Sequence, residues 1–179
     1  MKKRVIKVKL SEKGIDEAIK ELEDWYEWLQ EKAQEFVYEL AAIGVEIAKV
    51  NFGKAIYDGT NDVGVRWDDT DEYKATVIAN GNSVFFIEFG TGIKYPDDHP
   101  EKSADLVNHG QYGKGKGADP DGWDYIGDYM NKGGEFKHSV RGTSLFVFHT
   151  YGNPANMSMY LTREELKRKF EEVARKVFK

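Results

Sequence analysis

The sequence predicts an α+β fold in which long N-terminal helical segments and a C-terminal helix pack a small antiparallel sheet. Three observations carry this prediction. Apolar residues recur at helical spacing from Ile15 to Ile47 and again from Leu166 to Val177. Short alternating runs fall between residues 63 and 89. A glycine-rich insertion at about 94–140 then separates this sheet from a last apolar run, Leu145–Phe148.

The N-terminal third is predicted to be a strand followed by helix. Arg4–Leu10 alternates apolar and polar side chains, which favours a short strand. Ser11 has the side chain of a helix N-cap, and Leu10 could pack on Ile15 as a hydrophobic staple. The pattern over 11–51 fits one helix or two, and we expect a bend near Trp28–Lys32 because one helix would be near 60 Å long.

The middle of the chain is predicted to form an antiparallel meander over 63–89. Val63–Trp67 and Tyr73–Ala79 have strand-like sequences. Asn80-Gly81 is a strong hairpin signal because both residues tolerate positive φ. Val84–Phe89, which follows it, is predicted to be a buried strand or the last turn of an element. The acidic pairs Asp68-Asp69 and Asp71-Glu72 are expected in a solvated turn.

The C-terminal part is predicted to be a turn and one helix. Residues 151–157 contain Gly, Asn and Pro and favour a turn. Thr162 and Glu165 match a capping box, with Leu161 placed to pack on Leu166. Because no linker or repeat divides the chain, residues 1–179 are expected to form a single domain.

Composition excludes several classes of function. The chain has no cysteine, which removes disulfides, thiolate zinc sites and cysteine nucleophiles. No apolar run approaches the roughly 20 residues that span a bilayer, and no secretory leader pattern follows the basic N-terminus. The formal net charge is −5, and residues 55–150 hold most of the excess acid, the reverse of a DNA-binding face. We therefore expect a cytoplasmic protein at synthesis.

Glu88 is the most informative single residue. It lies within the apolar run Val84–Phe89, directly before Gly90-Thr91-Gly92. A carboxylate is costly to bury unless it is paired or hydrogen-bonded. Two glycines beside a threonine let the backbone turn sharply. Glu88, Phe89, Gly90, Thr91 and Gly92 are therefore predicted to form a structural turn fixed by Glu88, which accepts backbone N–H bonds or pairs with a cation.

Two other kinds of chemistry are possible from the sequence. The residues Asp97, Asp98, His99 and His109 could hold a divalent metal in a hydrolase or nuclease, although their spacing matches no metal motif. The loop Gly113–Gly117 could bind a protein partner, but it lacks the spacing of a phosphate-binding loop. His138 and His149 are isolated in the sequence. No Gly-x-Ser-x-Gly motif is present, and no catalytic residue, metal site or cofactor is predicted.

The order of these motifs resembles a known family. Ile87–Ile93 follows the predicted hairpin, and Gly152-Asn153-Pro154-Ala155-Asn156-Met157-Ser158-Met159-Tyr160-Leu161 precedes the last helix. Together they are similar to the small tail-component, or head–tail joining, proteins of long-tailed bacteriophages, whose pattern covers nearly the whole chain. Two departures are the insertion Lys94–Val140 and the missing proline near Phe52–Tyr57.

The resemblance implies a non-enzymatic virion protein made in the host cytoplasm. It would form a homo-oligomeric ring at the head–tail junction and contact other neck, portal-adaptor or tail proteins. DNA would pass through without specific binding, and no membrane would be involved. The expected assembly contacts are Trp25, Trp28, Tyr112, Trp123, Tyr125, Asn153, Pro154 and Met157.

Overall fold

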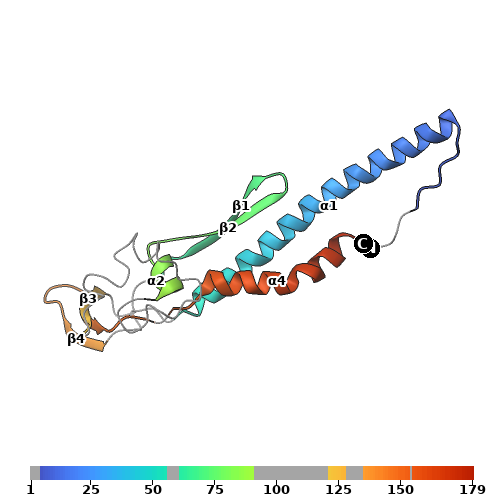
Figure 1. Cartoon of the computed structure of the whole chain (residues 1–179). Coiled ribbons are helices and arrows are strands. Elements are labelled where there is room, and N and C mark those ends of the chain that lie inside the picture. Colours follow the sequence, from blue (N-terminus) through green and yellow to red (C-terminus); the bar gives the residue numbers. More distant parts are fainter. Residues whose placement is uncertain (1–4, 56–60, 91–120, 128–134, 154) are drawn as a thin grey trace.

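The computed structural model describes residues 5–55, 61–90, 121–127, 135–153 and 155–179. Two helices of unequal length lie side by side, with a two-stranded hairpin along the longer one (Figure 1). A separate three-stranded sheet lies at the end of the molecule farthest from the start of the long helix (Figure 1). The predicted α+β fold, with a long N-terminal helix, a C-terminal helix and small antiparallel sheets, is confirmed.

The first helix, α1, runs unbroken over Glu12–Gly53, so the predicted bend at 28–32 is wrong. Its 42 residues give a length of about 63 Å at 1.5 Å per residue. Ser11 is the N-cap, as predicted, and its hydroxyl accepts a bond from Gly14 N at 3.2 Å. Of the strand predicted at 4–10, the described residues 5–10 form no ladder with any described strand. Leu10 is 98% exposed, so the predicted staple is also wrong.

The hairpin joins β1 (Gly64–Asp71) to β2 (Lys74–Asn80), close to the first two strands that were predicted. Its turn is at Glu72 and Tyr73. The second hairpin, predicted at Asn80-Gly81, does not form, because residues 84–89 after it are helical. Asp71 accepts a bond from Glu72 N at 2.7 Å, which stabilises the turn. The predicted acidic turn is thus right for Glu72, whereas Asp68, Asp69 and Asp71 belong to β1.

The third strand of the predicted meander is a short helix, α2 (Val84–Phe89). Gly81, three residues before it, has φ of +144°, and a Cβ there would lie 2.7 Å from the carbonyl oxygen of Asp62. Asn80-Gly81 therefore lets the chain leave β2 close to Asp62 and enter α2.

The second sheet contains β3 (Trp123–Gly127), β4 (Glu135–Ser139) and β5 (Phe146–Thr150), in the order β3-β5-β4 and antiparallel throughout. Its central strand β5 is the predicted apolar run. Tyr125 and Phe148 stack with ring centroids 5.6 Å apart, and Phe136 lies 6.2 Å from Phe148. These aromatic contacts join all three strands.

The last helix, α4, spans Ser158–Val177 and packs along the second half of α1. It begins four residues before Thr162, so the predicted capping box and the Leu161 staple are wrong. Thr162 is instead buried within the helix at 2% exposure. Phe36 of α1 meets Phe170 edge-on at 5.0 Å, and Phe178 lies 6.4 Å from Trp28.

The buried apolar residues are few and lie mostly where α1, α2 and α4 meet. They are Ala41, Val45, Ala48, Phe52, Ile87, Phe148, Ala155, Val173 and Val177. Gly44 is buried on the same part of α1, where a Cβ would lie 2.9 Å from Val77 Cγ2 and 3.1 Å from Leu166 Cδ1. This glycine lets β2 and α4 approach α1 together. Along the described residues, no helix combines the length and apolarity needed to cross a bilayer.

Candidate functional site

The carboxylate of Glu88 caps the N-terminus of α4. Its Oε2 accepts a hydrogen bond from Met159 N at 2.7 Å, and its Oε1 accepts one from Tyr160 N at 3.0 Å. Met157, the N-cap residue by position, makes no side-chain capping bond. Glu88 is 6% exposed, so these bonds form in a largely water-free setting. The sequence-based expectation that Glu88 accepts backbone N–H bonds is confirmed, and its negative charge also suits the positive end of a helix dipole.

The segment before α4 satisfies the carbonyl groups of α2 in return. Asn153 Nδ2 donates to Phe86 O at 3.0 Å, and Asn156 N donates to Ile87 O at 2.8 Å. Met157 N donates to Glu88 O at 3.1 Å. The carbonyls at a helix C-terminus otherwise have no partner within the helix. Glu88 of α2 thus provides acceptors for N–H groups at the start of α4, and the segment before α4 provides donors for the carbonyl groups at the end of α2.

Two asparagines extend this junction to the end of α1. Asn51 Nδ2 donates to Ser158 O at 3.2 Å and to Thr162 Oγ1 at 3.1 Å. Asn156 Nδ2 donates to Asn51 O at 2.8 Å and to Ser158 Oγ at 2.7 Å. Ser158 is fully buried, and the Thr162 hydroxyl donates to Ser158 O at 2.7 Å. We call Asn51, Glu88, Asn153, Asn156, Ser158 and Thr162 the helix junction.

The start of α2 is held by Asp62, just before the hairpin. Its carboxylate accepts bonds from Asn82 N at 2.8 Å and Ser83 N at 2.9 Å, and from the Ser83 hydroxyl. The Ser83 hydroxyl bond, followed by the two backbone bonds, lowers the pKa of Asp62 to about 2. Polar contacts at the two ends of α2 thus link it to the residue before the hairpin at one end and to α4 at the other.

The helix junction is suited to holding elements together, not to chemistry. Its polar atoms bond to one another and to the backbone, and its one carboxylate is occupied by helix N–H groups. Within the described ranges, no group of three or more His, Asp and Glu side chains could hold a metal ion. Asp97, Asp98, His99 and His109, the alternative metal ligands, lie outside the described residues.

The predicted turn residues divide between the described and undescribed parts. Phe89 ends α2, and Gly90 follows it buried with φ of +77°, a conformation that favours glycine. Thr91 and Gly92 lie outside the described residues.

The residues predicted to make assembly contacts lie in different parts of the structure. Trp25 and Trp28 are half-buried on α1, and Trp28 meets Phe178. Trp123 and Tyr125 lie on β3. Asn153 and Met157 belong to the segment that binds α2, so their described contacts are internal. Tyr112 and Pro154 lie outside the described residues.

Several residues of the helix junction and of the start of α2 were missed from the sequence. The bonds Asn51–Ser158 and Asp62–Ser83 join residues 107 and 21 positions apart, and no local motif marks such a pair. Asn156 was part of the quoted motif, yet its bond to Asn51 spans 105 residues. The signal that could have been used is the buried polar residue itself, because such a residue needs a partner.

A smaller polar cluster lies on the three-stranded sheet. His149 lies on strand β5, and its Nδ1 is 2.7 Å from Asp124 Oδ1 although the residue is isolated in the sequence. Lys137 Nζ lies 2.9 Å from the same oxygen. The hydrogen bond with His149, then that with Lys137, holds the pKa of Asp124 below its usual value. These contacts cross-link β3, β4 and β5.

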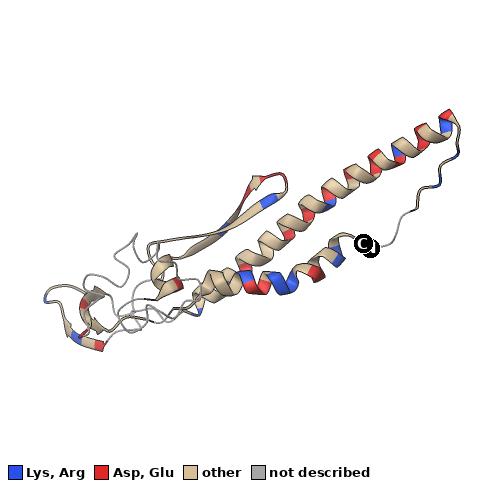
Figure 2. Ribbon diagram, in the orientation of Figure 1, with Lys and Arg blue, Asp and Glu red and all other residues tan. Residues whose placement is uncertain are grey.

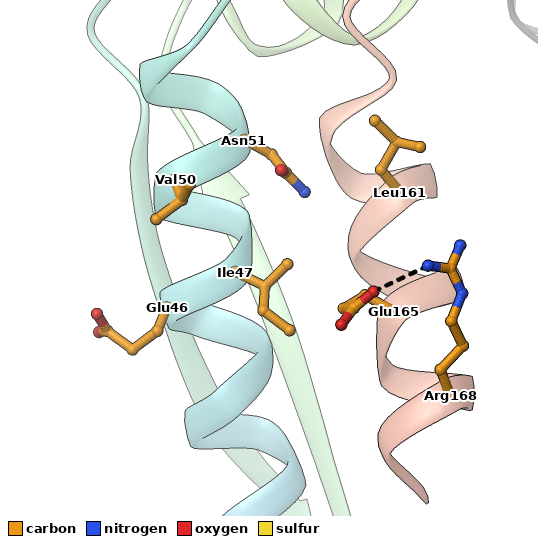
Figure 3. A pocket seen from close by; sticks show the side chains of 7 residues that line it. All are labelled: Glu46, Ile47, Val50, Asn51, Leu161, Glu165 and Arg168. Carbon is orange, nitrogen blue, oxygen red and sulfur yellow. Dashed lines mark hydrogen bonds and ion pairs between the residues drawn. The ribbon is translucent and has the colours of Figure 1, made fainter.

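A shallow groove of about 530 Å³ opens between α1 and α4 (Figure 3). It is lined by Glu46, Ile47, Val50, Asn51, Leu161, Glu165 and Arg168. Val50 is 51% exposed and Leu161 44% exposed. We call this the α1–α4 groove.

Comparison with protein-family models, with curated proteins and with solved structures finds no match to this chain.

Proposed function

We propose that this protein is a structural component of the head–tail junction of a long-tailed bacteriophage, where it forms a ring between the capsid portal and the tail. One observation carries the proposal. The two sequence stretches on which the resemblance to head–tail joining proteins rests meet in space, because Glu88 of the first accepts bonds from Met159 N and Tyr160 N of the second. A pair of motifs held together in this way favours a shared structural role over two unrelated functions.

The exposed surface supports an assembling protein. Large apolar side chains are 43–64% exposed on α1, α2, β3, β4 and α4, among them Ile19, Phe85, Ile126, Phe136 and Phe170. These side chains are available for contacts between copies. A ring needs a head-to-tail interface that closes on itself, so two different surfaces must be available on each copy.

Oligomeric state tests the proposal directly. The purified chain is measured by native mass spectrometry and negative-stain electron microscopy, alone and mixed with portal and tail proteins of the same phage. A closed ring in either sample supports the proposal. A chain that stays monomeric in both overturns it, and micromolar binding of Mg²⁺, Mn²⁺ or Zn²⁺ by calorimetry would then favour the hydrolase alternative.

DNA is expected to pass without specific binding. Asp69 and Asp71 are exposed on β1, and carboxylates repel phosphate. The protein should produce no sequence-dependent mobility shift at physiological salt, and the triple variant Asp68→Lys/Asp69→Lys/Asp71→Lys should bind DNA more tightly than the parent and slow DNA passage. A tight, sequence-specific shift by the parent chain would contradict this expectation.

A further inference from the structure

The first half of α1 carries an apolar stripe that is about half exposed. Spacings of four, three and four residues place its members on one face of the helix: Ile15, Ile19, Leu22 and Tyr26. They are 47%, 49%, 51% and 59% exposed. The C-terminal end of α4 reaches α1 at Trp28, where Phe178 meets it, and the stripe lies before that point. We call these four residues the α1 stripe.

A row of exposed carboxylates runs along one side of the α1 stripe. At about 100° per residue, its members lie roughly 60–120° round the helix from Ile15: Glu12, Asp16, Glu23 and Glu27. Within the described part of the chain, none of these four carboxylates is in an ion pair. Figure 2 shows the acidic side chains along this half of α1. We call these four residues the acidic row. A partner for this face therefore combines apolar side chains with cations.

The segment before α1 has this combination. Residues 1–10 contain five Lys and Arg and no acidic side chain. We call the described residues 5–10 the N-terminal arm. In the arm, Lys7 and Lys9 alternate with apolar side chains, of which three are 67%, 47% and 98% exposed: Val5, Val8 and Leu10. An extended arm spans about 16 Å at 3.3 Å per residue, and the α1 stripe also spans about 16 Å at 1.5 Å per residue. The arm and the stripe thus match in length, charge and apolar character.

The arm of the same chain lies on another side of α1. It crosses the helix at Gly14, where a Cβ would lie 2.5 Å from Lys9 O and 2.9 Å from Lys9 Cβ. Ser11 N donates to Lys9 O at 2.8 Å, which fixes this turn. Gly14 comes one residue before Ile15, so it points about 100° round the helix from Ile15, on the side away from the acidic row. The arm therefore leaves the α1 stripe and the acidic row of its own chain open.

We propose that the N-terminal arm of one copy docks on the α1 stripe of a neighbouring copy, with Lys7 and Lys9 beside the acidic row. This inference rests on the proposed ring and names the contact that joins its subunits. Burial of the two apolar surfaces supplies the attraction, and the opposite charges fix the position of the arm on the stripe. The arm and the stripe are different surfaces, so the contact is head-to-tail and can close into a ring.

Cysteine cross-linking tests this contact, and the parent chain has no cysteine to give background. A mixture of the Val8→Cys and Ile19→Cys variants, treated with a short bismaleimide, should form a covalent heterodimer. The double variant should form a ladder of covalent oligomers on denaturing gels. As a matched control, Ile126→Cys, which is 64% exposed on β3, should not cross-link to Val8→Cys. Circular dichroism checks that each variant is folded.

The same experiment separates exchange between copies from closure within one chain. If the double variant cross-links within single chains and the mixture gives no heterodimer, the arm covers the stripe of its own chain and the proposal is wrong.

Charge reversal gives an independent measurement. Lys7→Glu/Lys9→Glu in the arm or Glu23→Lys/Glu27→Lys in the acidic row should each weaken self-association by up to about fivefold per ion pair at low salt. Combining the two sets should recover the parent's association. Lys74→Glu, an exposed charge reversal on β2, is the control and should leave association unchanged.

The outcomes distinguish this contact from the ring itself. If rings form but the mixed cysteines do not cross-link and the combined charge variant is not rescued, the arm exchange is wrong and the ring remains. If the heterodimer forms but native mass spectrometry finds dimers and no ring, alone and with portal and tail proteins, the exchange stands and the ring is wrong. If no oligomer forms under any condition, both proposals fail.

Discussion

Replacing Glu88 with alanine removes the cap of α4 and should lower the free energy of unfolding by about 3 kcal/mol. The structure gives this figure from two bonds, at 2.7 and 3.0 Å, between a largely buried carboxylate and helix N–H groups. Hydrogen bonds to a charged group contribute roughly 1.5–3 kcal/mol each, so two give about 3 kcal/mol at the lower bound. For a chain of this length the midpoint of thermal unfolding should fall by roughly 6–12 °C.

The assay is urea unfolding followed by tryptophan fluorescence and by circular dichroism. Glu171→Ala is the matched control, because Glu171 lies on α4 and its ion pair with Arg175 is fully on the surface, with side chains 79% and 81% exposed. The control should change stability by less than about 1 kcal/mol. Glu88→Gln should fall between the two, since an amide keeps one acceptor oxygen and turns an NH₂ group toward the other N–H. A Glu88→Ala variant no less stable than Glu171→Ala would refute the capping role.

Three further outcomes follow from the described contacts. The folded pKa of Asp62, about 2, is below the usual 3.8, so its contribution to stability is present above about pH 4 and is lost as the pH falls toward 2. The stability difference between the parent and Asp62→Asn should shrink over that range in acid titrations, and Ser83→Ala should raise the Asp62 pKa measured by NMR. Gly44→Leu should destabilise the chain by about 1–3 kcal/mol in thermal unfolding, because β2 and α4 leave no room for a side chain there. Gly53 has open space around it, so Gly53→Ala should stabilise α1 by up to about 1 kcal/mol in the same measurement. Asn51→Ala should cost about 1–3 kcal/mol in urea unfolding, since it leaves Ser158 O and Thr162 short of a donor.

The parts of the fold that the sequence predicted depend on local patterns. Helical spacing is repeated over many turns in α1 and α4, so their existence could be recognised. The N-cap at Ser11 and the strands β1, β2 and β5 likewise follow from residues next to one another in sequence.

Two of the errors occur where a distant residue decides the local conformation. A six-residue apolar run is compatible with a strand or a helix. Val84–Phe89 becomes helical where Asp62, more than 20 residues earlier, binds the N–H groups of Asn82 and Ser83. Thr162 matches a capping box, yet α4 starts at Ser158 because Glu88 supplies the cap. Neither choice can be read from the neighbouring residues alone.

The helix junction was predicted only in part, because its contacts also join residues that are far apart in sequence. Burial of a carboxylate in an apolar run indicated that Glu88 needs partners, and this prediction is confirmed. The identity of those partners depended on which helix terminus the fold brings to it. Asn51 and Asn156 gave no comparable signal, because Asn51 stands within a helical pattern and Asn156 in a turn segment where asparagine is ordinary.

The position of the α4 cap also has a consequence for the order of folding. The bonds from Glu88 to Met159 and Tyr160 span 71 and 72 residues, and the bond from Asn51 to Ser158 spans 107. Contacts of this separation form only after a large loss of loop entropy. The first turn of α4 therefore gains its capping bonds only when α1 and α2 are in place.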